Sequence, residues 1–411
     1  MKTSKLFLAS LFALAAVQIA SAQIEIRITG STAFRGAVHT AIGNILQPGF
    51  TVGWVGTGTL NGAPEAIWKG TTITGAVNVI IKTAWSGSVG GVFSLTTGRG
   101  IPDAGATPAI TAGFLVDSTA TSVLPGTSNV PATFESPVAP AALDKAGFPN
   151  VGMSDSFQGS TPYKTPVLAS STAGEQVGVI PFQWAKNVGA PATLTNVTNQ
   201  LATAILVNGN IPLSQFTGNA ADATTNIYVT GRNNDSGTRL DAFAESGFGI
   251  NNPPLQVDPT QAGADHITSG AWVAAAGGVV YYNPGTNGRS SGGQVAGDLN
   301  ATGSQGVLAG NGSLISYLGV NDAATVNGGA NTLLYNGVAY SPDTVANGQY
   351  SFWAYEHLFL APTFTGVAAN SPYRTVVNAL AARILNFDAG VSGIALGAMN
   401  VARQVEGGVI F

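Results

Sequence analysis

The sequence predicts an α/β protein with a largely parallel sheet, and three observations support this class. Short apolar stretches are repeatedly followed by a small polar turn and then by apolar residues at helical spacing. Strands that alternate with helices in this way favour α/β architecture. The chain has 411 residues, which is enough for two or more domains. Its 54 glycines are about twice the average share of ~7%, as expected for short elements joined by frequent turns.

The first 22 residues are predicted to form a secretory signal peptide. Lys2 and Lys5 precede an apolar stretch over 6–19, and Ala20-Ser21-Ala22 has the small residues of a cleavage site. This stretch is short for a membrane span. We therefore expect a mature chain that begins at Gln23 and lies in the periplasm or outside the cell.

Composition excludes several classes of function. The formal net charge is −4 and no basic run is present, which argues against binding to nucleic acid or anionic membranes. The chain has no cysteine, so disulfides and thiolate metal sites are excluded. Its three histidines are far apart in sequence, which disfavours a zinc site. We expect neither a metal nor a cofactor.

The strand–turn–helix unit recurs three times along the chain. The three units comprise a strand at 24–28 with a helix through 37–45, a strand at 77–82 with a helix through 89–95, and a strand at 227–230 with a helix through 240–243. In the first unit, Ser31 or Thr32 is the expected N-cap of the helix.

The remaining segments complete the expected outline. A strand over 177–182 is a candidate crossing between lobes, and 373–385 has apolar residues at helical spacing. Residues 98–140 and 250–312 are rich in Gly, Pro, Thr and Ala and are predicted to be surface excursions, the second containing a strand at 278–282.

The polar turns have the chemistry of an anion site. A turn that opens a helix exposes free backbone N–H groups, and the helix dipole favours negative charge there. In open α/β sheets, such turns gather at the carboxyl ends of the strands. Arg232, close before Ser236-Gly237-Thr238, adds a side chain suited to paired hydrogen bonds with an oxyanion.

Each turn taken alone has a simpler interpretation. Ser31 and Thr32 fit an ordinary helix cap, Ser86 and Ser88 fit a structural Gly-rich turn, and Asp155 fits an N-cap or Asx-turn. The combination of all three turns with a nearby arginine favours the anion site.

These motifs also resemble a known family. The stretches "ITGSTAF", "WSGSVGGVFSL", "VGMSDS", "IPFQWAKN" and "GRNNDSGTRLDAF" occur in the order seen in periplasmic phosphate-binding proteins of ABC-type uptake systems, which are type II solute-binding proteins. "LISYLGV" and "YSFWAYEHLFL" resemble later landmarks of that family. The Arg-x-x-x-Ser-Gly-Thr turn is the most specific of these pieces.

The resemblance implies a two-lobed fold with mixed, mainly parallel sheets, helices on both faces, and inorganic phosphate in the cleft. It implies that Phe34 offers its backbone N–H and that Ser31 or Thr32, and Ser86 or Ser88, offer hydroxyls. It further implies that Asp155 accepts the proton of hydrogen phosphate. Arg232 would pair with the anion, and Ser236, Gly237 and Thr238 would surround it at the helix start.

The resemblance also suggests the domain organisation and the partners. Lobe I would comprise 23–178 and 349–411, with an insertion at about 98–140, and lobe II would comprise 179–348, with an insertion at about 250–312. The expected partner is an ABC-type membrane permease, and the protein is expected to be a monomer. No enzymatic activity is expected, because "NDSGT" is no Gly-x-Ser-x-Gly elbow and no histidine lies in a motif beside it.

Two alternatives of another class remain open. The chain ends in 405–411 with apolar or small residues at alternate positions and a terminal Phe, as in outer-membrane β-barrels. A Gly/Thr/Asn-rich surface structural protein without a small ligand is favoured by composition alone.

Overall fold

The computed structural model describes residues 23–56, 58–97, 113–120, 122–123, 148–301, 312–364 and 366–411. The predicted signal peptide and most of the predicted excursion at 98–140 lie outside these residues. Within them, no helix combines the length and the apolar character that crossing a bilayer requires.

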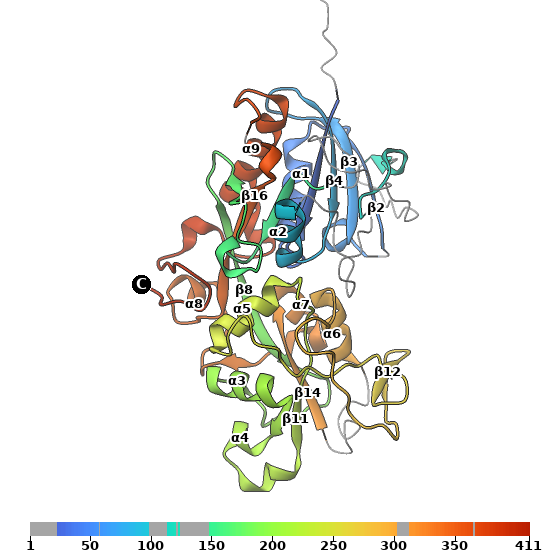
Figure 1. The fold of residues 1–411 in the computed structure, drawn as a ribbon, viewed down its shortest axis with the longest axis vertical. Helices are drawn as coiled ribbons and strands as arrows, with labels where there is room; N and C mark the ends of the chain where they lie inside the picture. Colours follow the sequence, from blue (N-terminus) through green and yellow to red (C-terminus); the bar gives the residue numbers. More distant parts are fainter. Residues whose placement is uncertain are drawn as a thin grey trace, which may run out of the picture.

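Two lobes share one continuous sheet, which has 12 strands among the described residues (Figure 1). Its order is β10-β11-β14-β8-β16-β6-β1-β4-β3-β2-β5, with β7 beside β16. The strands of the first lobe are β1 (Ile24–Gly30), β2 (Thr51–Trp54), β3 (Glu65–Thr71), β4 (Asn78–Ala84), β5 (Ser122–Val123), β6 (Val151–Ser154) and β7 (Ala169–Ser170). Those of the second lobe are β10 (Asn210–Pro212), β11 (Asn226–Val229) and β14 (Gly312–Gly319). The long strands β8 (Gln176–Lys186) and β16 (Trp353–Leu360) run from one lobe to the other.

The sheet is mixed, as predicted, but the prediction that most of its strand pairs are parallel is wrong. Strand β1 pairs in parallel with β4 and β6, and β11 pairs in parallel with β14. The other pairings in this sheet are antiparallel, including those of β8 with β14 and of β16 with β8 and β6. The reason is that β8 and β16 cross the junction in opposite directions and that β2, β3 and β4 form an antiparallel meander.

Helices lie against both lobes of the sheet (Figure 1). They are α1 (Arg35–Ile45), α2 (Ser88–Thr97), α3 (Asn199–Asn208), α4 (Ser214–Thr217), α5 (Gly237–Ser246), α6 (Gly292–Asn300), α7 (Val320–Ala323), α8 (Pro342–Ala346) and α9 (Pro372–Arg383). Two small sheets add β9 (Asn196–Val197) with β15 (Leu334–Tyr335), and β12 (His266–Thr268) with β13 (Ala271–Val273). The three predicted strand–turn–helix units are therefore present as β1–α1, β4–α2 and β11–α5.

Two local predictions are wrong. The N-cap of α1 is Phe34 and makes no side-chain cap, because the chain continues as a turn for three residues after Gly30. The predicted strand at 278–282 is a loop in which Tyr281 forms an isolated bridge with Val257. Its apolar residues are explained by packing rather than by strand pairing, since Val279 and Tyr281 lie against the cluster around Val257.

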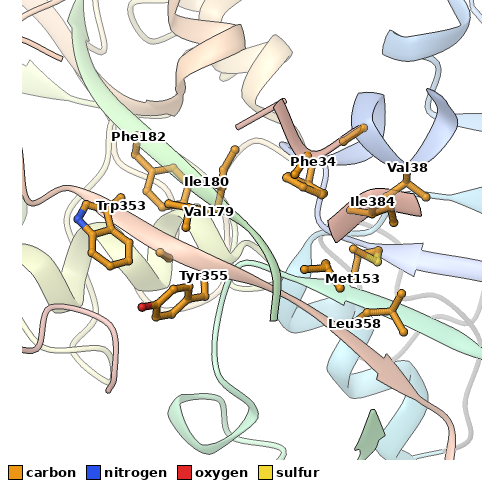
Figure 2. Packing of buried hydrophobic residues seen from close by; sticks show 14 of the residues in the cluster. Phe34, Val38, Met153, Val179, Ile180, Phe182, Trp353, Tyr355, Leu358 and Ile384 are labelled. Atoms are coloured by element: carbon orange, nitrogen blue, oxygen red, sulfur yellow. The ribbon is translucent and has the colours of Figure 1, made fainter. Parts of the chain in front are cut away.

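The crossing strands pass through the hydrophobic core. Phe182 and Val179 of β8, and Trp353 and Leu358 of β16, belong to one cluster that extends into both lobes (Figure 2). Phe34 lies in the same cluster, so the turn after β1 is anchored directly to the crossing strands.

The last residues, 399–411, form a C-terminal segment beside the junction of the lobes (Figure 1). Arg403 binds the Glu245 carboxylate of α5 and the carbonyl of Trp353, and its guanidinium lies 4.1 Å from the Trp353 ring centre. Glu406 accepts hydrogen bonds from the Phe157 N–H and the Ser160 hydroxyl in the first lobe. The segment therefore contacts both lobes.

Candidate functional site

The three polar turns meet where the lobes face each other. The N–H of Gly87, in the turn after β4, donates to the carbonyl of Gly30 after β1 at 2.9 Å. The N–H of Gly90 in α2 donates to the carbonyl of Asp235, which precedes α5, at 3.1 Å. Two turns of the first lobe and one of the second are thus in direct contact, and we call this cluster of turns the cradle.

Asp155 lies within this cradle, between Ser88 and Gly237. It follows β6, is 1% exposed, and donates its N–H to the Ser88 hydroxyl oxygen at 3.2 Å. Its carboxyl faces Gly237, the first residue of α5, so closely that a side chain at 237 would overlap it. The carboxyl therefore lies directly beside the first residue of α5.

The first turn of α5 has unused donors. The Ser236 side chain caps the helix by accepting the Arg239 N–H at 3.2 Å, and the Ser236 carbonyl accepts the Leu240 N–H at 3.3 Å. No hydrogen bond among the described residues uses the N–H of Gly237 or Thr238. Two N–H groups at a helix start are thus available to an anion.

Arg232 is held rigidly across the junction. Its Nε donates to the Arg289 carbonyl at 3.1 Å, and its Nη2 donates to the Ser290 carbonyl at 2.8 Å and to the Thr32 hydroxyl oxygen at 3.3 Å. The side chain is only 2% exposed. In the part of the chain that the structure describes, no hydrogen bond uses Nη1, so this nitrogen keeps its donors for a ligand.

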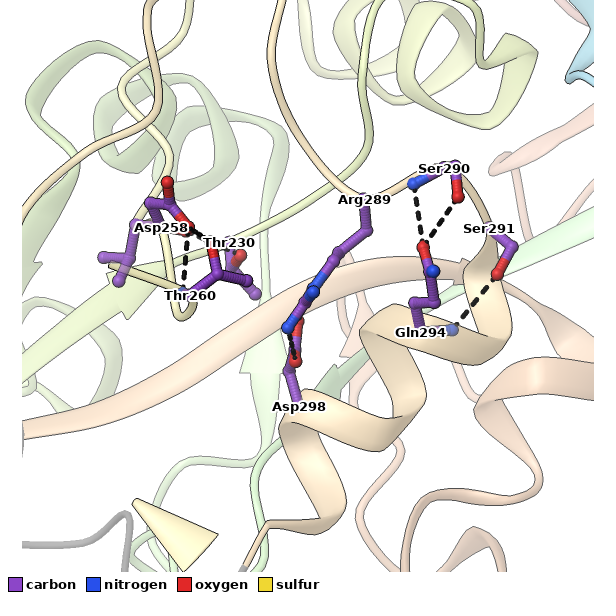
Figure 3. A network of polar contacts seen from close by, with 9 residues as sticks. Thr230, Asp258, Thr260, Arg289, Ser290, Ser291, Gln294 and Asp298 are labelled. Atoms are coloured by element: carbon purple, nitrogen blue, oxygen red, sulfur yellow. Dashed lines mark hydrogen bonds and ion pairs between the residues drawn. The ribbon is translucent and has the colours of Figure 1, made fainter. Parts of the chain in front are cut away.

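The carbonyls that hold Arg232 are themselves fixed by α6 (Figure 3). Arg289 makes two hydrogen bonds to Asp298, at 2.8 and 2.6 Å, and the Ser290 N–H and hydroxyl both bind Gln294. Residues 250–312 are predicted to be a surface excursion, and their described part, 250–301, contains α6 and the β12–β13 hairpin and supports the candidate site. Sequence patterns did not indicate these elements, because short elements bounded by glycines leave little periodicity.

The remaining predicted site residues differ in their surroundings. The Ser31 hydroxyl is fully buried and has no hydrogen-bond partner among the described residues. Phe34 is fully buried at the start of α1. Ser88 contacts Asp155, whereas the Ser86 hydroxyl lies 3.1 Å from the Thr29 hydroxyl at the edge of the turn. The structure thus brings Ser88 closer to the acid than Ser86.

Burial dominates the electrostatics of the cradle. It raises the pKa of the Asp155 carboxyl to about 6, although the Ser88 hydrogen bond and the Arg232 charge both act to lower it. Burial likewise raises the pKa of Asp235 to about 6 against the charges of Arg232 and Arg239. Both acids therefore change charge close to the physiological range.

Three further acids surround Asp155 and were not among the predicted site residues. Asp241 and Glu356 are buried, and neither carboxyl has a hydrogen-bond partner among the described residues. Burial raises the pKa of both well above the usual range. The third acid, Glu406, belongs to the C-terminal segment. Within the described residues, no group of three or more His, Asp or Glu side chains is arranged to hold a metal ion.

Sequence signals existed for two of these acids. Asp241 lies four residues after Gly237, on the same face of the helix. Glu356 interrupts the apolar run "WAYEHLFL". No sequence pattern links Glu406 to the cradle, because its contacts depend on where the end of the chain folds back.

Two cavities flank the cradle. One, of about 210 Å³, is lined by Ser236, Arg239 and Tyr163 among others. The other, of about 240 Å³, reaches Thr32, Arg35 and Asp322. Residues of both lobes line each cavity, so both would change shape if the lobes moved apart.

The histidines lie outside the cradle. The ring nitrogens of His39 contact the Leu60 carbonyl and the Thr83 hydroxyl, and Nδ1 of His357 contacts Glu175. His266 is in β12, where its ring contacts the Ala264 carbonyl. The cradle therefore contains hydroxyls and carboxyls but no imidazole that could activate them.

Comparison with known proteins gives similarity at the level of solved structures. No family model and no curated protein matches the chain. The fold is similar to that of a protein from Clostridium perfringens described as a phosphate ABC transporter substrate-binding protein with bound phosphate (13% identity, TM-score 0.46, covering 90% of this chain and 98% of that one). It is similar to an ABC-type phosphate transport receptor from Vibrio cholerae (11%, 0.43, 89% and 96%) and to PstS from Borrelia burgdorferi (12%, 0.36, 87% and 92%).

Proposed function

We propose that this protein is a secreted solute-binding protein that captures inorganic phosphate between its two lobes and delivers it to an ABC-type membrane permease. One observation carries the proposal: a buried arginine and a buried carboxyl share a cradle with two unused N–H groups at the start of α5. Donors from three directions suit a tetrahedral oxyanion. The residues proposed to bind it are Ser31, Thr32, Phe34, Ser86, Ser88, Asp155, Arg232, Ser236, Gly237 and Thr238.

The carboxyl favours phosphate over sulfate. Near neutral pH, inorganic phosphate carries one or two protons, because its second ionisation has a pKa of ~6 or slightly higher and its third ionisation lies far higher. An ionised Asp155 can accept one such proton in a hydrogen bond, whereas sulfate offers none and would place two negative charges together. Sites that pair with a ligand hydroxyl can reject analogues without it by about 10⁴-fold.

The lobes are proposed to close on the ligand by a hinge at β8 and β16. Arg232 donates to the Thr32 hydroxyl of the first lobe, and the Asp235 carbonyl accepts from the Gly90 N–H, so these contacts across the junction support closure. Hinge closure around a ligand is a common movement in two-lobed proteins. Capture and release require no bond making, so no enzymatic activity is proposed.

Calorimetric titration with phosphate, arsenate, sulfate and molybdate tests the assignment. Tight binding of phosphate without binding of sulfate is expected. Tight sulfate binding by the unmodified protein would contradict the choice of ligand, and the absence of heat with every anion would contradict the oxyanion site.

Export is proposed on the sequence of residues 1–22 alone. N-terminal mass spectrometry of protein from the native cell should find Gln23, or a residue next to it, at the start of the mature chain. A mature pool that retains Met1 would contradict secretion.

A further inference from the structure

Glu356 is an acid in an environment that disfavours negative charge. It lies inside the crossing strand β16, is 0% exposed, and neither carboxyl oxygen has a hydrogen-bond partner among the described residues. The groups that interact with it electrostatically include Asp155, Ser31 and Asp241, and none of them is a cation.

The sheet register places Glu356 beside the cradle. Strands β16, β6 and β1 are neighbours, and Met153 of β6 pairs with both Leu358 of β16 and Gly30 of β1. Strands β1 and β6 run toward the cleft and β16 runs away from it. Ser31 after Gly30, Asp155 after β6 and Glu356 before Leu358 therefore share the cleft end of three adjacent strands.

A carboxyl in this position is protonated. An ionised carboxylate that is buried without a cation or donors is costly, and such groups neutralise instead. Burial raises the pKa of Glu356 well above its usual range, the Asp155 charge acts in the same direction, and the smaller effect of the Ser31 hydroxyl opposes them. In its neutral form, Glu356 has one O–H to donate.

The Ser31 hydroxyl is the group that can receive this proton. It is also fully buried, interacts with the Glu356 carboxyl, and has no hydrogen-bond partner of good geometry. A serine has a single hydroxyl proton. If Glu356 were ionised, Ser31 would donate to it and present lone pairs to the anion. If Glu356 is neutral, it donates to Ser31, and the Ser31 proton is free to point into the cradle.

We propose that Glu356 is a positioning residue that donates a hydrogen bond to the Ser31 hydroxyl oxygen and thereby turns the Ser31 hydroxyl into a donor to the bound anion. This inference rests on the proposed phosphate site. It extends the site by one layer, since Glu356 acts through Ser31 and not on the anion itself.

Infrared difference spectroscopy with and without inorganic phosphate tests the inference. The carbonyl stretching band of the protonated Glu356 carboxyl should be present at neutral pH and absent from Glu356→Gln, which assigns it. Phosphate should shift this band in the unmodified protein, because Ser31 becomes more polarised when it donates to the anion. The shift should vanish in Ser31→Ala, which removes one oxygen and leaves the carboxyl in place.

Asp241→Asn is the matched control, because Asp241 is a second buried acid near Asp155 that lacks a hydrogen-bond partner. It should remove a different band and leave the Glu356 shift intact. In calorimetry, Ser31→Ala should weaken phosphate binding about tenfold or more, the usual effect of losing a hydrogen bond to a charged group. Glu356→Gln should weaken phosphate binding much less, because the glutamine amide still donates a hydrogen bond to Ser31.

Two results would overturn the inference: the absence of a protonated Glu356 band at neutral pH, or an unchanged phosphate shift in Ser31→Ala. Failure of the proposed function would look different. The unmodified protein would then give no heat with phosphate, whatever the state of the Glu356 band.

Discussion

Asp155 and Gly237 approach each other so closely that residue 237 has no room for a side chain. A Cβ atom placed on Gly237 would lie 1.5 Å from Asp155 Oδ1 and 2.7 Å from Ser88 Cβ. Gly237 belongs to the second lobe, and Asp155 and Ser88 belong to the first. The glycine therefore permits the start of α5 to reach the carboxyl across the junction.

Gly237→Ala is expected to prevent this approach and to weaken phosphate binding. Overpacking of this kind costs about 1–3 kcal/mol, or roughly five- to a hundredfold in affinity. Calorimetric titration measures the effect. Gly297→Ala is the matched control, because it adds a methyl group inside α6 where nothing lies within 4 Å. It should keep the affinity, and wild-type affinity in Gly237→Ala would contradict the close approach in the bound state.

Arg232→Ala is expected to weaken phosphate binding by about 2–4 kcal/mol, in line with the truncation of buried charged partners. Arg232→Lys should recover only part of this loss, since an ammonium cannot hold Arg289, Ser290 and Thr32 while also binding the anion. Calorimetric titration of both variants with phosphate measures these changes in affinity. Arg383→Ala, in a partly exposed pair with Asp388, serves as the control and should bind normally. Normal affinity in a folded Arg232→Ala protein would exclude the arginine from the site.

Asp155→Asn is expected to reduce the discrimination between phosphate and sulfate. The asparagine amide can donate to a sulfate oxygen, whereas the carboxylate repels it. Parallel titration of the native protein and the variant with both anions measures the ratio of affinities. The same ratio in both proteins would remove Asp155 from the ligand contacts.

Sulfate binding by the native protein should strengthen as the pH falls. Burial raises the pKa of Asp155 to about 6, so below that pH the carboxyl is neutral and can donate a hydrogen bond. Sulfate affinity is therefore expected to rise between about pH 7.5 and about pH 5, a range in which sulfate itself does not titrate. In Asp155→Asn the dependence should be much weaker, and an equal dependence in the two proteins would assign it to another group.

The same shift affects the stability of the ligand-free protein. The folded-state pKa of Asp155 is raised, so its contribution is fully present below the ordinary value of 3.8 and is lost as the pH rises through about 6. A shift of this size corresponds to about 3 kcal/mol. Urea unfolding in phosphate-free buffer should show the native protein losing stability relative to Asp155→Asn between about pH 4 and pH 7. If the difference in unfolding free energy between the two proteins stayed constant over this pH range, it would contradict the raised pKa of Asp155.

Much of the fold could be predicted because local patterns determine it. The units β1–α1, β4–α2 and β11–α5 each combine an apolar strand, a polar turn and helical periodicity, and these signals need no knowledge of distant residues. Helix α9 was predicted at 373–385 and occupies Pro372–Arg383. The direction of the crossing strands was not predictable in this way, since it depends on how the second lobe returns to the first.

In the candidate site, too, local sequence patterns predict some residues, whereas the others depend on how distant segments pack together. Asp155, Arg232 and Ser236-Gly237-Thr238 follow strands, and the sheet brings strand ends together. The carbonyls of Arg289 and Ser290 lie in a Gly-rich stretch. Because every residue has a backbone carbonyl, the residue types there could not predict that these two accept hydrogen bonds from Arg232. Glu356 was visible as an acid in an apolar strand, but its relation to Ser31 follows only from the pairing of β16, β6 and β1.

The C-terminal segment gives the hinge a third attachment. If β8 and β16 were the only connections between the lobes, one lobe could rotate relative to the other about these two strands. Arg403 donates a hydrogen bond to Glu245 of the second lobe. Three residues later, Glu406 accepts hydrogen bonds from the Phe157 N–H and the Ser160 hydroxyl of the first lobe. Because Arg403 and Glu406 are only three residues apart, a large rotation of one lobe relative to the other would break the contacts of one of these two side chains. Residues 403–406 would thus restrict the proposed opening of the two lobes.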